Sequence, residues 1–540
     1  MKLSELIHGC EYIDMMTMSR DQSGNLACRS DTVDREIGSS CLLDRDISGV
    51  AYDSRKIEKG YLFVAMRGEM FDGHDFIQDA VKRGAVAVVH EKGVEIPPLE
   101  ELAPEVDSAH AVMFIGVAHS RQTLPCVANN FYGEPSRSLV VIGLTGTNGK
   151  TTTTYILKSL LESWGKKVGL IGTIQYMIKD RIYPAPYTTP ESLEFQGLLK
   201  EMFLSGCTHV ISEISSHALA QFRVDSAVVK IAVFTNLTRD HLDFHRTMEE
   251  YFKAKERLFR DILDKNGTAV INSDDPYGKR LISSCHPSQT IFTYGLQEGA
   301  DIRAVDIENS STGLRFSILF RGERYQINSR LLGLPNVYNI LAAVGVALSL
   351  GISWEEMRAG LLALEHIPGR FEKIEAGQDF LCIVDYAHSE DSLERLIDTA
   401  RDLIRRHSRH GEPHDSPARI ITVFGCGGDR DHGKRPQMGA IATGLSDLVI
   451  ITSDNPRTEE PNDIIKEIES GTVRDNYIIE PDRKEAIRKA VSAARGGDIV
   501  LIAGKGHEDY QEIRGIRYRF SDKEILEELI KNKLDVQNAV

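Results

Sequence analysis

The sequence lacks the features of secreted and membrane proteins. Its eight cysteines are scattered over 540 residues with no CxxC pair, so we expect reduced, mostly structural thiols in a cytoplasm. The first residues, MKLSELIHGCEYID, contain no long apolar core and no small-residue cleavage site, which argues against a secretory signal. The most apolar helical stretch, 338–352, is shorter than the ~20 residues that span a bilayer. We therefore predict a cytoplasmic protein without membrane insertion.

Positive charge is also scarce. The chain has 64 Lys and Arg against 79 Asp and Glu, a net charge of −15, and no strong basic block. This balance argues against a nucleic-acid partner. It does not exclude a ligand that carries phosphate, because loops and helix ends can supply positive potential locally. No internal repeat or low-complexity tract interrupts the sequence.

The length exceeds what one hydrophobic core can serve, so we expect two to four domains. The pattern divides into three blocks, 1–138, 139–366 and 367–540. In the first block, LFVAM and then GHDFIQDAVKRGAVAVVHE predict a small α/β unit in which a helix precedes a strand. The stretch 15–45 is polar and aperiodic, and we expect a mobile surface segment there.

The other two blocks alternate apolar strands with helical segments. VVIGLT, HVISEI, KIAVFTN and GTAVINS in the second block predict a largely parallel sheet. FLCIVDY, RIITVFG, DLVIIT and DIVLIAG in the third block are each followed by a loop and a helical segment, a doubly wound pattern. Ligands of such sheets lie beyond the carboxyl ends of the strands. The stretch 407–419 resembles a surface insertion.

The segment GLTGTNGKTTTTY (143–155) follows a predicted strand and opens a predicted helix. Gly146 and Gly149 let the backbone wrap closely around phosphates, Lys150 can neutralise β- and γ-oxygens, and the Thr151 hydroxyl can reach Mg²⁺. The strict G-x-x-x-x-G-K-[ST] pattern fails, because Leu144 stands at its first position. A glycine-rich turn before an ordinary helix is the alternative. The strand–loop–helix context favours an ATPase site.

A second polar loop, SDNPRTEEP (453–461), follows the apolar run LVIIT. Asp, Asn and Pro favour solvated turns, so a plain turn is one interpretation. The other is a site for a small ligand that carries charges of both signs, since Asp454, Asn455 and Arg457 stand within four residues.

Together with TGTNGKTTT, further short segments occur along the chain in an order that points to one family. They are YTTPES (187–192), SEISSHAL (212–219), TNLTRDHLDFH (235–245), YFKAKERLF (251–259), GLPNVYNILAA (333–343), HIPGRFE (366–372), VDYAH (384–388), VFGCGGDRDHGKRPQM (423–438), DNPR (454–457) and GKGHEDYQ (504–511). Together these segments resemble the Mur ligases of bacterial cell-wall synthesis, over nearly the whole chain beyond about residue 46. Within that family they are most similar to members that add 2,6-diaminopimelate.

The resemblance implies an α/β fold with three domains. These are an N-terminal UDP-substrate-binding domain, a central P-loop-type ATPase domain, and a C-terminal Rossmann-like domain that binds the amino acid. It also implies the chemistry: ATP phosphorylates the terminal carboxylate of UDP-N-acetylmuramoyl-L-alanyl-D-glutamate, and the amino group of meso-diaminopimelate attacks the acyl phosphate. The resemblance therefore implies small-molecule substrates and the cofactors ATP and Mg²⁺. It implies a monomeric enzyme that acts in peptidoglycan precursor synthesis and so contributes to cell shape and cell division.

The resemblance also assigns residues to ATP, metal and catalysis. ATP contacts map to Gly146, Thr147, Asn148, Gly149, Lys150, Thr151, Thr152, Asn339, Arg370, Asp385 and His388. Metal ligands map to Thr151, Glu213, His241 and Lys255, and the catalytic residues to Lys150, Glu213, His241 and Lys255. In the family, the lysine matching Lys255 is carbamylated to N6-carboxylysine. Each has a plainer reading: Glu213 as a hydrogen-bonded strand end, His241 as an ordinary histidine, and Lys255 as a solvated helix lysine. Lys253 lies off the face of Lys255 on a helix.

The two other substrates map to separate sets of residues. Contacts to the UDP-muramoyl dipeptide map to Ser54, Thr188, Thr189, Ser215, Gln221 and Arg223. Contacts to diaminopimelate map to Arg430, Asp454, Asn455, Pro456, Arg457, Gly504 and Glu508. The second carboxylate of diaminopimelate needs an extra cation, for which a bidentate arginine is well suited.

Alternatives remain open at this stage. The same reaction with L-lysine is one, although lysine-adding relatives lack the arginine of DNPR. Folylpolyglutamate synthases share the ATPase core, but the segment FVAMRGEMFDGHDFI (63–77) argues against them. A catalytically silent nucleotide-binding protein is the third. It would be favoured if any of four residues were replaced, and none is: Lys150, Glu213, His241 and Lys255.

Overall fold

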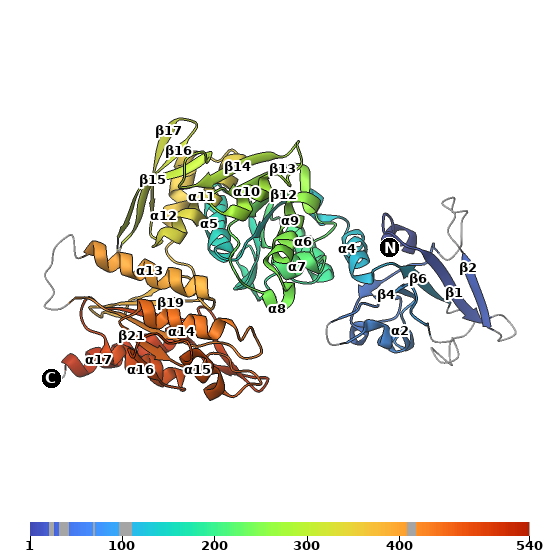
Figure 1. Cartoon of the computed structure of the whole chain (residues 1–540). Coiled ribbons are helices and arrows are strands. Elements are labelled where there is room, and N and C mark those ends of the chain that lie inside the picture. Colours follow the sequence, from blue (N-terminus) through green and yellow to red (C-terminus); the bar gives the residue numbers. More distant parts are fainter. Residues whose placement is uncertain are drawn as a thin grey trace.

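The computed structural model describes residues 1–20, 26–31, 43–68, 71–96, 111–310, 312–407 and 417–538. In this part of the chain the strands form three large sheets, which follow one another along the sequence, and a small hairpin. Figure 1 shows each large sheet with its own helices, and the central unit lies between the other two. The expected α/β architecture of three units is confirmed.

The first sheet has the described order β2-β1-β6-β5-β4-β3, with β3 to β6 parallel and β1 and β2 antiparallel. The predicted helix and strand of this block are present as α2 and β5, and the segment LFVAM begins within β4. The bounds are β1 (Asp14–Arg20), β2 (Leu26–Asp31), β3 (Gly49–Ala51), β4 (Tyr61–Val64), β5 (Ala87–Glu91), β6 (Val112–Val117), α1 (Leu3–Leu6), α2 (Ile77–Lys82) and α4 (Ser120–Phe131).

The expectation for 15–45 was wrong where the structure describes it. Strand β1 pairs antiparallel with both β2 and β6, so this stretch extends the sheet. Met15 packs against one hydrophobic cluster of the sheet and Met16 against another, because successive side chains of a strand point to opposite faces. Residues 21–25 and 32–42 lie outside the described residues, and so do 408–416, most of the insertion expected at 407–419.

The central sheet has the described order β10-β9-β8-β11-β7-β12-β13-β14-β15-β16-β17, parallel from β8 to β15 and antiparallel at both ends. All four predicted strands are present, as β7, β11, β12 and β13. Their bounds and those of the others are β7 (Val140–Thr145), β8 (Val168–Ile171), β9 (Gln175–Ile178), β10 (Arg181–Pro184), β11 (His209–Glu213), β12 (Val229–Phe234), β13 (Leu263–Asn272), β14 (Thr290–Gly295), β15 (Ile302–Ser310), β16 (Gly313–Phe320) and β17 (Glu323–Ser329).

Helices cover both faces of the central sheet, which explains why its strands are apolar throughout. On β7, Ile142 faces the cluster that includes α5 and α11, whereas Val141 faces the cluster that includes α6 and α9. The helices of this unit are α5 (Lys150–Ser163), α6 (Ser192–Leu204), α7 (Ser216–Ala220), α8 (Leu242–His245), α9 (Met248–Arg257), α10 (Pro276–Ile282), α11 (Leu334–Ser349) and α12 (Trp354–Ala363).

The third sheet has the described order β18-β19-β23-β20-β21-β22, and its strands from β19 onward are parallel. The four predicted strands are β19, β20, β21 and β23. The bounds are β18 (Glu372–Ile374), β19 (Leu381–Asp385), β20 (Ile420–Phe424), β21 (Leu448–Ile451), β22 (Tyr477–Ile479), β23 (Ile499–Ala503), α13 (Glu390–His407), α14 (Lys434–Leu445), α15 (Pro461–Glu469), α16 (Arg483–Ala493) and α17 (Asp522–Asn538).

One connection of the third sheet differs from the expected pattern. Strand β23 is followed first by the hairpin of β24 (Tyr510–Ile513) and β25 (Ile516–Arg519), and only then by α17. The hairpin pairs with the loop after β21 through Arg457 and Ile513. The segment between β23 and α17 is therefore a hairpin that contacts the loop after β21, and not the simple loop that we expected. Within the described ranges, no helix is long and apolar enough to cross a membrane.

Candidate functional site

The side chains singled out from the sequence gather along one cleft. The cleft has a volume of about 2440 Å³ and is lined by residues of all three units. A pocket for one drug-sized ligand measures ~300–1,000 Å³, so this cleft has room for several ligands. The predicted site residues that line it are Ser54, Thr147, Asn148, Gly149, Lys150, Thr151, Thr152, Thr188, Thr189, Glu213, Ser215, Gln221, Arg223, His241, Arg370, His388, Arg430, Asp454, Asn455, Arg457, Gly504 and Glu508.

The glycine-rich loop connects β7 to α5, as the sequence predicted. Gly146 (φ 149°) and Gly149 (φ 86°) both have positive φ. A Cβ on Gly149 would collide with the side chain of Asn339, so glycine satisfies two constraints at once. The loop turns tightly and presents the first backbone N–H groups of α5, which have no partner inside the helix and favour an anion.

Two lysines point at the same loop carbonyl. Lys150 Nζ donates to the carbonyl oxygens of Gly146 and Thr147, both at 2.9 Å, and Lys255 Nζ donates to that of Gly146 at 2.9 Å. Burial lowers the pKa of Lys150, and it lowers the pKa of Lys255 still more strongly, with Lys150 as a second cause. Among the described residues, the hydrogen bonds of both ammonium groups end on carbonyl oxygens rather than on carboxylates.

Helix α9 turns its two lysines to different surroundings. Lys255 is buried and Lys253 is exposed, as expected for positions two residues apart on a helix. The Lys255 ammonium also lies 4.6 Å from the centre of the Tyr251 ring.

Glu213 ends strand β11 and is fully buried. Its carboxylate accepts hydrogen bonds from the N–H (3.0 Å) and hydroxyl (2.9 Å) of Thr173. The Thr151 hydroxyl donates to it at 3.0 Å, and Arg370 Nη2 donates to that hydroxyl at 3.1 Å. A carboxylate, a hydroxyl and a guanidinium therefore meet at the first turn of α5, with Arg370 contributed by the start of the third unit.

His241 stands just before the short helix α8 with φ 54°. Its N–H donates to Asp240 Oδ1 at 2.9 Å, and its Nε2 lies 3.4 Å from Asp240 Oδ2. Burial lowers the pKa of His241 to about 3, although Asp240 acts in the opposite direction. The imidazole is thus neutral at physiological pH and keeps a lone pair for a ligand.

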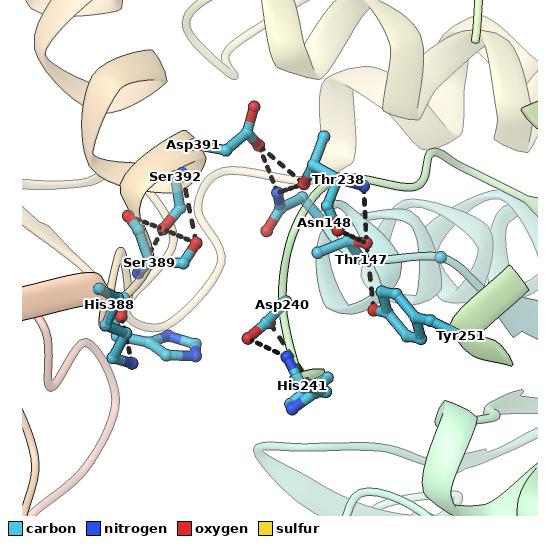
Figure 2. Close-up of polar contacts among 12 residues, drawn as sticks. Thr147, Asn148, Thr238, Asp240, His241, Tyr251, His388, Ser389, Asp391 and Ser392 are labelled. Atoms are coloured by element: carbon cyan, nitrogen blue, oxygen red, sulfur yellow. Dashed lines mark hydrogen bonds and ion pairs between the residues drawn. The ribbon is translucent and has the colours of Figure 1, made fainter. Parts of the chain in front are cut away.

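Asp391 joins the phosphate loop to the third unit. Figure 2 shows its carboxylate, at the start of α13, reaching Asn148 and Thr238. Asn148 Nδ2 donates to Asp391 Oδ2 at 2.6 Å, and Thr238 Oγ1 donates to the same oxygen at 3.3 Å. Nearby, Arg239 Nη1 lies 3.3 Å from Glu390 Oε1. Asp391 of the third unit therefore holds both the phosphate loop and the loop after β12 of the central unit.

The loop after β21 is held by the hairpin that follows β23. Asn455 Oδ1 accepts from the Glu512 N–H at 2.9 Å, and Asn455 Nδ2 donates to Glu508 Oε2 at 2.8 Å. Arg457 has φ 50°, and its N–H donates to the Glu512 carbonyl at 3.0 Å. Arg457 Nη1 donates to the Gly428 carbonyl at 2.6 Å. These contacts fix the loop and bring Arg457 and Glu508 into one part of the cleft.

Three other residues predicted for this part lie around the loop. Arg430 is exposed, with Nη1 3.4 Å from the Asp429 carbonyl oxygen. A Cβ on Gly504 (φ 117°) would lie 2.6 Å from Asp454 Oδ2, so glycine permits the close approach of this loop. Pro456 supplies the bend and does not itself line the cleft.

The residues predicted for the nucleotide dipeptide form a connected set. The Thr189 hydroxyl donates to the Glu213 carbonyl at 2.8 Å and accepts from the Ser215 N–H at 3.0 Å. Arg223 donates to the Thr189 carbonyl at 2.9 Å and to Gln221 Oε1 at 2.6 Å. The hydroxyl oxygens of Thr188 and Thr173 are 3.1 Å apart. Ser54, in the first unit, begins a short 3₁₀ turn.

Three residues expected to contact ATP do not line the cleft, namely Gly146, Asn339 and Asp385, and Lys255 does not line it either. Asn339 lies behind the phosphate loop, where its Nδ2 donates to Asn336 Oδ1 at 3.0 Å. Asp385 accepts from the N–H groups of Phe371 (2.6 Å) and Ala387 (2.8 Å). Asn339 is buried, and Asp385 is held by the backbone of the loops beside it. Both side chains therefore support the loops and do not themselves line the cleft.

The comparison with known families agrees with this geometry. Three family descriptions match successive parts of the chain: "Mur ligase family, catalytic domain" (46–132), "Mur ligase middle domain" (144–347) and "Mur ligase, glutamate ligase domain" (369–506). A protein of Solibacter usitatus (strain Ellin6076) named UDP-N-acetylmuramoyl-L-alanyl-D-glutamate--2,6-diaminopimelate ligase is 44% identical over 91% of this chain and 94% of its own length. The chain belongs to the Mur ligase family.

Solved Mur ligases share the fold. A structure titled as a UDP-N-acetylmuramoyl-L-alanyl-D-glutamate--2,6-diaminopimelate ligase is similar with a TM-score of 0.64 and 33% identity, covering 92% of this chain and 97% of that one. A MurF ligase from Thermotoga maritima in complex with ADP has a TM-score of 0.60 at 21% identity, covering 91% and 99%.

Sequence reasoning missed several residues of this Mur ligase that the structure places in or beneath the cleft. Asp391, Lys505 and Glu512 hold the predicted residues in position. Lys505 and Glu512 lie within or beside the quoted segment GKGHEDYQ, and Asp391 lies three residues after VDYAH. The sequence could have pointed to these three residues only because they lie in or near a recognised motif. Their hydrogen-bond partners could not be predicted, because those contacts join loops that are distant in the sequence.

Proposed function

We propose that this Mur ligase is an ATP-dependent acid–amino-acid ligase that adds meso-2,6-diaminopimelate to UDP-N-acetylmuramoyl-L-alanyl-D-glutamate. The supporting observation is the single cleft, in which the phosphate loop, buried Glu213 and the Arg457 loop face common space. The curated relatives, at 40–44% identity, carry the matching name. An acyl phosphate is the intermediate, and the product is a precursor of peptidoglycan, which links the enzyme to cell-wall biogenesis, cell shape and cell division.

ATP binds at the phosphate loop in this proposal. The N–H groups at the start of α5 and the Lys150 ammonium receive the phosphates, for which Lys150 leaves the loop carbonyls. Arg370 adds positive charge near Thr151. Bringing a carboxylate up to a triphosphate joins two anions, and preorganised cations reduce that repulsion in the transition state. His388 and Thr152 complete the lining, with Asn339 and Asp385 acting behind it.

The oxygen-rich surroundings of Thr151 and Glu213 fit Mg²⁺. A buried carboxylate beside a hydroxyl supplies the hard oxygen ligands that this ion prefers. Among the described residues, no group of three or more His, Cys, Asp or Glu side chains could hold a metal. Mg²⁺ commonly binds through one or two carboxylates together with substrate phosphates. His241 and a modified Lys255 are the other proposed ligands. Bound Mg²⁺ supplies charge that neutralises the phosphate oxygens.

Lys255 is proposed to be carbamylated. Its Nζ attacks CO₂, forms an N–C bond and releases a proton, which gives N6-carboxylysine. The support is its position: the side chain is buried, lies beside the phosphate loop and, among described residues, has no carboxylate partner within 4 Å. Carbamylation converts an uncompensated cation into an anionic oxygen ligand, and it thereby balances the neighbouring Lys150.

The two organic substrates are proposed to bind to different domains that line the same cleft. Ser54 of the first domain (1–138) is proposed to contact the uridine end, and the set around Thr189, Ser215 and Arg223 in the central domain (139–366) the muramoyl dipeptide. The third domain (367–540) is proposed to bind diaminopimelate. There Arg457 and Arg430 receive the distal carboxylate, and Asp454 and Glu508 receive ammonium. We further propose a cytoplasmic monomer.

A phosphate-release assay tests the function. Purified protein with UDP-N-acetylmuramoyl-L-alanyl-D-glutamate, ATP and Mg²⁺ is expected to release phosphate when meso-diaminopimelate is added. L-lysine is expected to be a much poorer substrate, because it has no distal carboxylate to pair with the arginines of the cleft, a loss of ~1–3 kcal/mol. Equal or faster release with L-lysine would overturn the specificity. No release with either amino acid would favour a silent nucleotide-binding protein.

The Asp391 tether gives a further expected result. Asp391→Ala should raise the KM for ATP roughly 5- to 20-fold, because Asn148 of the phosphate loop loses a charged hydrogen-bond partner worth about 1–2 kcal/mol. The KM for diaminopimelate should change little. Asp398→Ala, an exposed residue of the same helix, is the matched control. An unchanged KM for ATP in Asp391→Ala would show that the contact does not support nucleotide binding.

A further inference from the structure

Lys505 is a buried cation without a role in the proposed chemistry. Its side chain is fully buried, and its Nζ lies 3.0 Å from Asn455 Oδ1 and 3.3 Å from Glu508 Oε2. Gly504 and Gly506 on either side have positive φ (117° and 54°), which folds the lysine beneath the loop after β21. Burying an ammonium is costly unless it is paired, so its partners indicate its purpose.

The first consequence concerns the orientation of Asn455. Its amide oxygen accepts from Lys505 Nζ at 3.0 Å and from the Glu512 N–H at 2.9 Å, which uses both lone pairs. The amide nitrogen must then face the other way, where it donates to Glu508 Oε2 at 2.8 Å. Lys505 therefore fixes which end of the Asn455 amide meets Glu508.

The second consequence concerns Glu508 itself. This side chain lines the cleft, and the hydrogen bonds from Asn455 and Lys505 both end on Oε2. Among the described residues, these two bonds hold one carboxylate oxygen and leave Oε1 for a ligand. A carboxylate held in this way is suited to receive an ammonium group.

The charges around Glu508 oppose one another. Burial and the nearby Asp454 raise the pKa of Glu508, whereas Lys505 and the Asn455 amide lower it. Arg483 also faces it but is committed to Asp522, at 2.7 Å. Tyr386 and Tyr510 also lie near Glu508. Burial raises the pKa of both hydroxyl groups, so both tyrosines are neutral. Lys505 is thus the cation bonded directly to this carboxylate.

We propose that Lys505 is a positioning residue that orients the Glu508 carboxylate and balances its charge, so that Glu508 receives an ammonium group of the incoming diamino acid. This inference rests on the proposed function, which supplies a substrate with two ammonium groups. Lys505 acts through Glu508 and Asn455, since it is fully buried beneath them.

The test compares Lys505→Met with Lys505→Arg. Methionine keeps an unbranched chain without charge, and arginine keeps the charge. The measured quantity is kcat/KM for meso-diaminopimelate between pH 6.5 and 9.5, expressed as the ratio of variant to wild type. That ratio cancels the ionisation of the substrate's own amino groups.

The expected sign follows from the lost cation. Without Lys505 the pKa of Glu508 rises further, so less of it is ionised at neutral pH. Below a raised pKa the ionised fraction grows about tenfold per pH unit. The ratio for Lys505→Met should therefore be about 10- to 100-fold below one at pH 7 and should recover as the pH rises. The ratio for Lys505→Arg should stay nearly flat, and the KM for ATP should not change in either variant.

A ratio for Lys505→Met that is low but independent of pH would overturn the proposal, because a merely structural lysine produces that result. The double variant Glu508→Gln/Lys505→Met serves if the single variant does not fold, since it buries no unpaired carboxylate. It should be no less active than Glu508→Gln alone; a large additional loss would also overturn the proposal. A wild-type protein inactive with diaminopimelate would instead reject the proposed function.

Discussion

Replacing Lys255 by alanine is expected to reduce phosphate release ~10²- to 10³-fold, the size of effect seen when one preorganised charge is removed from a transition state. In the proposed enzyme, carbamylated Lys255 offers an anionic oxygen ligand beside the phosphate loop. Alanine removes that ligand and leaves Lys150 unbalanced. A small carboxylic acid such as formate or acetate should fill the space and restore part of the rate.

The same variant should remain folded. Lys255 is buried, and burial lowers its pKa strongly, which shows that the position does not favour a cation. Alanine removes a buried charge whether the side chain is an ammonium or a carbamate, and the avoided cost of burying that charge offsets the lost packing. A melting temperature close to that of the wild type, together with the lost activity, would separate chemistry from stability.

Lys253→Ala is the matched control, because this lysine is on the same helix, two residues away and exposed. Its activity should equal that of the wild type. Full activity in Lys255→Ala would reject the carbamate, and equal losses in both variants would point to the helix rather than to one side chain. Mass spectrometry that preserves CO₂ adducts offers an independent measurement of the modified lysine.

Replacing Arg457 by alanine is expected to raise the KM for meso-diaminopimelate roughly 10- to 100-fold. The reason is the loss of a charged, bidentate partner of the distal carboxylate, worth about 1–3 kcal/mol. L-lysine has no such carboxylate, so its poor use should change little and the preference for diaminopimelate should collapse. Competition between the two amino acids in the ligation assay measures this preference directly.

Arg514→Ala is the control for that experiment. Arg514 belongs to the turn of the neighbouring hairpin, its side chain is exposed, and it pairs with Glu460 at 2.7 Å. Its side chain reaches the loop only at Glu460, three residues after Arg457, whereas its backbone N–H donates to the Arg457 carbonyl, and alanine keeps that N–H. A parallel loss for both amino acids in Arg457→Ala would indicate that the loop collapsed, and it would remove the argument for a carboxylate clamp.

The sequence predicted local features wherever short-range rules decide them. The strand, glycine turn and helix around Lys150 formed as expected, because turn residues and periodic apolar side chains act within a few positions. The exposure of Lys253 and the burial of Lys255 also agree with the helical period, which turns residues two positions apart to different faces. The segment 15–45 shows where such rules end: β1 is a strand because β6 offers an edge to pair with, and pairing partners are not encoded locally.

What the sequence alone determined is the set of chemical groups and the order of the elements that carry them. The alternation of strands and helices predicted α/β blocks, and the ordered segments carried the resemblance to Mur ligases, which implied three domains. Only the tertiary structure decided how those groups meet. Asp391 reaches Asn148 across 243 positions of sequence, and Lys505 lies beneath Asn455 across 50. Hydrogen bonds require contact within about 3 Å, and the folding of distant loops onto one another decides that contact.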